Sequence, residues 1–131
     1  MIDKSKSLAN LKNIVWNKEG LESSLAEKCR NLWNVPISKF TTEDFRLLIG
    51  QKISLDLLIP VALDILENNP LAQGDLYRGD LLNSVLSVPK YFWLEFPNLN
   101  NRLVEVKTEV ETLEETISQE ILPLLKDFDF K

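Results

Sequence analysis

Residues 54–67, SLDLLIPVALDILE, constrain the fold more than any other part of the chain. On a helix at about 100° per residue, Asp56, Asp64 and Glu67 share one arc of roughly 80°, and aliphatic side chains fill most of the remainder. A helix that is apolar over most of its circumference is buried, usually at the centre of a bundle. Ser54 is placed to cap this helix, and the three carboxylates should face water. The segment therefore predicts an all-α fold.

Shorter helices are expected on both sides of this segment. Apolar spacing predicts one helix over residues 7–16 and another that ends before Pro36. The apolar residues of the second are Leu21, Leu25, Cys29 and Leu32. Thr41 and Asp44 stand at capping-box spacing and open a third helix. Further along, we expect helices over residues 81–86, after Asp80 as cap, and 90–96.

The last predicted helix, residues 98–122, has the clearest periodicity. An apolar stripe runs along it within an arc of roughly 80° if the helix is straight. The stripe consists of Leu99, Leu103, Val106, Val110, Leu113, Ile117, Ile121 and Leu124. Glutamates lie on both sides of the stripe, and Pro123 should end the helix. We therefore predict a single domain, residues 1–131, folded as a bundle of about six or seven helices around residues 54–67 with a long acidic C-terminal helix.

Charge and composition exclude several function classes. The net charge is −5, and residues 105–131, with 8 Asp+Glu and 3 Lys+Arg, carry all of it. A nucleic-acid footprint would be basic, so direct nucleic-acid binding is not expected. The chain has no histidine and only one cysteine, Cys29, which disfavours a metal site, a cofactor and histidine-based catalysis. No apolar run approaches the length of a membrane span or a secretory signal, so we expect a cytoplasmic protein.

The loop after the central segment carries two Gly-Asp pairs, Gly74-Asp75 and Gly79-Asp80. The glycines can take positive φ, and Asp80 is placed to cap the next helix. The two carboxylates could form a catalytic pair, but local hydrogen bonding to the backbone explains both without catalysis. Tyr77 and Arg78 lie between the pairs, and these residue types often anchor protein interfaces. Alternatively, Arg78 simply pairs with a neighbouring Asp.

A series of short motifs resembles one bacterial family over residues 11–96, in the family's order. The motifs are Val15-Trp16, Cys29 ahead of Leu32, Phe40-Thr41 leading to DFRLLI at 44–49, Gly50-Gln51, LIPVAL at 58–63, NPLA at 69–72, GDLY at 74–77, GDLL at 79–82 and Phe92-Trp93. The chain is similar to the immunity proteins of contact-dependent growth inhibition (CDI) systems. This resemblance implies a cytoplasmic, non-enzymatic protein that binds the toxic C-terminal domain of a delivered effector. It further implies a nuclease toxin, with an EndoU-like ribonuclease as the leading candidate.

We therefore expect a protein that is monomeric when free and forms a one-to-one complex with a basic, nuclease-type toxin domain. The residues expected to contact it are Glu67, Asp75, Tyr77, Arg78, Asp80, Glu109, Glu111, Glu114 and Glu115. The leading alternative is a helical structural or adaptor protein that dimerises through residues 98–122, whose apolar stripe also resembles a coiled-coil seam. An enzyme that uses Asp75 and Asp80 ranks third.

Overall fold

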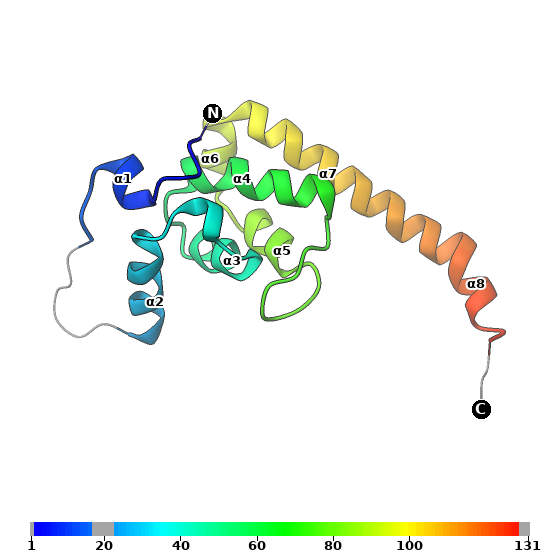
Figure 1. The fold of residues 1–131 in the computed structure, drawn as a ribbon. Coiled ribbons are helices and arrows are strands. Elements are labelled where there is room, and N and C mark those ends of the chain that lie inside the picture. Colours follow the sequence, from blue (N-terminus) through cyan, green and yellow to red (C-terminus); the bar gives the residue numbers. More distant parts are fainter. Residues whose placement is uncertain (1, 17–22, 129–131) are drawn as a thin grey trace. The chain divides into compact units, whose positions relative to one another are not determined.

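The computed structural model describes residues 2–16 and 23–128, and the regular elements in these ranges are all helical (Figure 1). The α-helices are α1 (Leu8–Lys12), α2 (Ser24–Trp33), α3 (Thr42–Gly50), α4 (Leu55–Asn68), α5 (Asp80–Leu86), α6 (Lys90–Glu95), α7 (Pro97–Thr116) and α8 (Leu122–Leu125). A 3₁₀ turn spans Ile37–Lys39, and a π-helical turn, Ile117–Ile121, joins α7 to α8. Counted with α7 through α8 as one continuous helix, the described ranges hold seven helices, which confirms the predicted all-α class.

The chain divides into two compact units, Met1–Pro89 and Lys90–Lys131. The single domain over residues 1–131 stays a prediction. Among the described residues, no helix is long and apolar enough to cross a bilayer.

Helix α4 supplies much of the core of the first unit. Its buried residues are Leu55, Leu58, Ile59, Val61, Ala62, Leu63 and Leu66, and the helix packs against α3 and α5. Asp56, Asp64 and Glu67 are exposed, as their shared arc predicts. The expected cap is wrong, however. Ser54 occupies the N-cap position with φ 47° and makes no side-chain cap hydrogen bond, because its backbone is left-handed instead of extended.

Helix α3 begins with the predicted capping box. Thr41 Oγ1 accepts a hydrogen bond from the Asp44 N–H (3.2 Å), and Asp44 Oδ2 accepts one from the Thr41 N–H (2.9 Å). Both ends of the motif are thus satisfied reciprocally. The helix buries Phe45, Leu48 and Ile49, and it packs on α5 as well as on α4.

Helix α1 is shorter than the sequence predicts. It ends at Lys12 because Asn13 adopts a left-handed conformation with φ 54°, which leaves Ile14 and Val15 beyond the helix and exposed. The segment after it is tied to α2 by the Trp33 indole N–H, which donates to the Ile14 carbonyl (2.8 Å). In α2, Cys29 is buried as expected. Leu21, assigned above to the same helix, lies outside the described residues.

In the second unit, α6 buries Phe92, whose ring contacts those of Trp93 and Phe96 at centroid distances of 5.2 and 4.8 Å. Helix α7, the π-helical turn and α8 follow as one continuous run (Figure 1). The prediction that Pro123 ends the helix is wrong. Pro123 is the second residue of α8, directly after the π-helical turn, and the helical run continues past it to Leu125.

Candidate functional site

Asp80 holds the Gly-Asp loop from inside. Its carboxylate accepts hydrogen bonds from three backbone N–H groups of the loop: Gly74 (2.6 Å), Leu76 (2.9 Å) and Tyr77 (3.3 Å). The side chain is only 2% exposed. Asp80 is the first residue of α5, after Gly79 at the N-cap, and no side chain caps that helix. The predicted capping role is therefore wrong, because the loop folds back and brings its own donors to the carboxylate.

Two residues of α3 complete this network. Glu43 Oε1 accepts a hydrogen bond from the Asp75 N–H (2.8 Å), so the loop is fastened to α3 as well as to α5. Arg46 grips Glu43 in a two-pronged pair, Nε to Oε1 and Nη2 to Oε2, at 2.5 Å each. The same Nε lies 3.9 Å from Asp80 Oδ2. Sequence reasoning missed Glu43 and Arg46, although their i, i+3 spacing on a capped helix was a usable signal.

The charges in this network support one another. The paired guanidinium of Arg46 holds the pKa of Glu43 below its ordinary value, and Glu43 in turn raises the pKa of Arg46. Burial alone would raise the pKa of Asp80. The N–H groups of Gly74, Leu76 and Tyr77, together with Arg46, outweigh burial and leave that pKa lowered. Asp80 is therefore an ionised structural acceptor at neutral pH.

The two glycines of the loop are needed for different reasons. Gly79 has φ 95°, so the prediction of positive φ is confirmed there. Gly74 is not among the positive-φ residues of the described chain, so it does not use that freedom. A Cβ at Gly74 would lie 2.6 Å from Glu43 Oε1 and 3.1 Å from Asp80 Oδ2, so only glycine lets the backbone approach these carboxylates.

The outer side of the loop is exposed. Asp75, Leu76, Tyr77 and Arg78 face solvent, with Leu76 63% and Tyr77 47% exposed. Asn83 Nδ2 on α5 donates to the Tyr77 hydroxyl, and Gln73 and Arg78 form an antiparallel bridge that closes the loop. Within residues 2–16 and 23–128, Arg78 makes no ion pair, so the alternative that it pairs with a neighbouring Asp does not hold. A fixed loop thus presents aromatic, aliphatic and cationic groups to solvent.

The predicted contact residues therefore fall into three groups. Asp75, Tyr77 and Arg78 are brought together on the outer side of the loop, whereas Asp80 is buried beneath it and belongs to the scaffold. Glu67 is exposed near the end of α4. The remaining four lie exposed on α7 in the second unit: Glu109, Glu111, Glu114 and Glu115.

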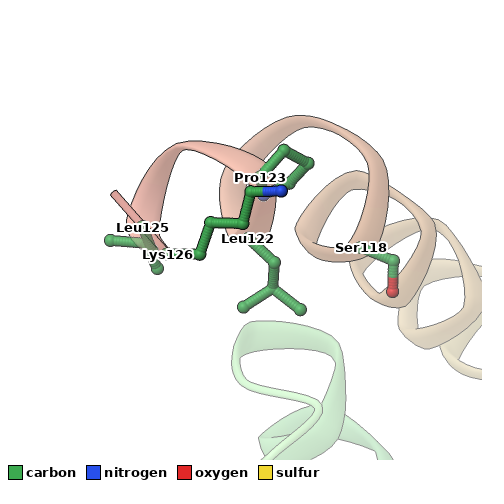
Figure 2. A pocket seen from close by; sticks show the side chains of 5 residues that line it. All are labelled: Ser118, Leu122, Pro123, Leu125 and Lys126. Carbon is green, nitrogen blue, oxygen red and sulfur yellow. The ribbon is translucent and has the colours of Figure 1, made fainter. Parts of the chain in front are cut away.

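The end of the second unit shows where the predicted apolar stripe is exposed. From Leu113 onward, the large apolar side chains are exposed, and they include Ile117, Ile121, Leu122, Leu124, Leu125 and Phe128. Figure 2 shows a shallow hollow beside them, lined by Ser118, Leu122, Pro123, Leu125 and Lys126. Nearer its start, α7 buries Leu103 and Val106. The apolar stripe is therefore buried near the start of the helix and uncovered toward its end.

Asp80 already accepts hydrogen bonds from three N–H groups of the loop, so it serves there as a structural acceptor and does not fit a catalytic pair with Asp75. In the part of the chain that the structure describes, no group of three or more His, Cys, Asp or Glu is placed to hold a metal ion.

Comparison with known proteins gives one match. A family model described as CDI immunity proteins matches residues 10–103, which include the loop, Glu43, Arg46 and Asp80. No curated protein and no solved structure matches the chain.

Proposed function

Because this chain belongs to the family of CDI immunity proteins, we propose that it protects its own cell by binding the C-terminal toxin domain of a CDI effector and blocking it. The family match over residues 10–103 carries this proposal, since it includes most of the first unit and the start of α7. We propose that the complex forms one to one in the cytoplasm, by surface complementarity and without turnover.

The charge of the chain supports a basic, nuclease-type toxin, with an EndoU-like ribonuclease as the first candidate. A nuclease must hold phosphates, so the path to its active site is cationic. This chain carries a net charge of −5, all of it within residues 105–131. Opposite charges steer the two proteins together and increase the association rate. Inhibition then follows if the bound immunity protein occupies the phosphate path.

The test uses the C-terminal toxin domain of a CDI effector whose gene neighbours the gene for this chain. Purified full-length chain should bind it tightly in calorimetry with a stoichiometry of one, and co-expression should restore growth to cells that express the toxin. The association rate should fall as ionic strength is raised, because salt screens the steering field. A toxin domain from an unrelated effector serves as the control. Absence of binding to the neighbouring toxin would refute the proposed function.

A second candidate, a helical adaptor that dimerises through the last helix, is favoured by one observation only: the exposed apolar side chains from Leu113 onward. Sedimentation over a wide concentration range separates the two. The immunity protein is expected to be a monomer that binds the toxin, whereas the adaptor is expected to be a dimer that does not bind it.

A further inference from the structure

The end of the second unit exposes several large apolar side chains that follow one another along the chain. Ile117 is 42% exposed, Ile121 43% and Leu124 67%, and they follow Leu113 along the run from α7 to α8. We call these four residues the apolar row. Isolated apolar side chains on a surface need no explanation, but several that recur along one helical run are typical of an interaction site.

The apolar row lies outside the residues that the family model matches. The match ends at residue 103, ten residues before Leu113. An exposed surface outside the matched region can serve a contact particular to this protein.

The charges around the apolar row indicate what covers it. Between residues 108 and 125 there are five glutamates and no lysine or arginine. Lys107 and Lys126 lie just outside this range. Lys107 Nζ is 3.3 Å from a carboxylate oxygen of Glu111, and both of these side chains are about two-thirds exposed. A second copy of this chain would bring the same glutamates opposite one another, and like charges oppose such pairing. A cationic surface would attract them. The charge pattern therefore favours a basic partner over a second copy.

We propose that the apolar row is the docking element for the toxin domain: it inserts into an apolar groove whose rim is basic, while Glu109, Glu111 and Glu114 approach that rim. This inference rests on the proposed function and adds which part of the chain makes the contact. The hollow lined by Leu122 and Leu125 continues the apolar surface at the α8 end (Figure 2).

The two kinds of residue have separate kinetic roles. Buried apolar contacts resist dissociation, so the row sets the dissociation rate. Exposed charges act mainly on diffusional encounter, so the glutamates set the association rate and its dependence on salt. This separation gives a readout that general damage to the fold would not reproduce.

The test measures binding of the full-length chain to the same purified toxin domain. Ile117→Gln combined with Ile121→Gln should weaken binding by about 100-fold, about tenfold for each side chain, through faster dissociation. Leu86→Gln combined with Leu94→Gln is the matched control, because these leucines are 53% and 71% exposed on α5 and α6 and should leave affinity unchanged. Glu109→Gln combined with Glu114→Gln should slow association and flatten its salt dependence. Circular dichroism confirms that each variant keeps its helical content.

The outcomes separate this inference from the function on which it rests. If wild type binds the toxin and the isoleucine variant binds equally well, the docking element is elsewhere and the immunity function stands. If wild type does not bind, the function itself fails. If sedimentation shows a wild-type dimer that the isoleucine variant dissolves, with toxin binding unchanged, the row pairs copies of this chain and the inference is overturned.

Discussion

The substitution Asp80→Asn tests how the Gly-Asp loop is built. Oδ1 of Asp80 accepts the Gly74 N–H, and Oδ2 accepts those of Leu76 and Tyr77 and faces Arg46. Asparagine offers one acceptor oxygen instead of two. Whichever way its amide turns, an NH₂ group meets at least one backbone N–H in a site that is 2% exposed.

The expected loss of stability is about 3 kcal/mol. Removing a hydrogen bond to a charged acceptor costs about 1.5–3 kcal/mol, and a buried donor left without an acceptor costs about 1–3 kcal/mol. For a chain of this length, a loss of this size lowers the melting temperature by roughly 10 °C. The helices themselves should remain, because the carboxylate does not cap α5.

Urea unfolding followed by circular dichroism measures this loss, and Asp75→Asn is the matched control. Asp75 also follows a glycine in the same loop, but its side chain is exposed, so its substitution should cost less than about 0.5 kcal/mol. If Asp80→Asn proves as mild as Asp75→Asn, the loop does not depend on the buried carboxylate and our account of it is wrong.

Acid gives a second, independent check of the same network. The folded pKa of Asp80 lies below its ordinary value of 3.8, so the ionised carboxylate stabilises the fold above that pH. The stabilisation is lost as the pH falls through the lower, folded pKa. The stability gap between wild type and Asp80→Asn should therefore stay constant from about pH 7 to 5 and narrow below about pH 4. If the stability difference between wild type and Asp80→Asn instead grew as the pH fell, the lowered pKa of Asp80 would be contradicted.

Three further predictions concern other parts of the chain. Thr41→Ala should lower the free energy of unfolding by about 1 kcal/mol, because it breaks a capping box. Ser54→Ala should change it very little, because Ser54 makes no cap hydrogen bond. Equal losses would contradict the cap geometry. Gly74→Ala should lower the free energy of unfolding by about 1–3 kcal/mol, because the new Cβ is crowded. Gly50→Ala should be neutral or stabilising, since a Cβ there meets only Ser84 Oγ at 3.6 Å. The reverse order would refute the close approach at Gly74. Burial raises the pKa of the Cys29 thiol. A thiol reagent should therefore modify the native protein at least about 100-fold more slowly than the denatured protein. Fast labelling of the native protein would place Cys29 at the surface.

The sequence by itself determined the helices whose signals are local. The capping box of Thr41 and Asp44, the apolar circumference of α4 and the exposed edge formed by Asp56, Asp64 and Glu67 all follow from spacing along the chain. The motifs spread over residues 11–96 likewise indicated the family that the match over residues 10–103 then showed.

Only the tertiary structure decided what the conspicuous polar residues do. Asp80 has the sequence signature of a helix cap, yet it holds the loop, because the N–H groups that reach it come from a chain reversal that spacing does not encode. Glu43 and Asp75 are 32 residues apart in the sequence, and only folding brings the Asp75 N–H within 2.8 Å of Glu43 Oε1. The apolar stripe of the last helix follows from the spacing of its residues, but that spacing does not show which turns of the stripe are buried. Burial depends on what packs against each turn, and from Leu113 onward those side chains remain exposed.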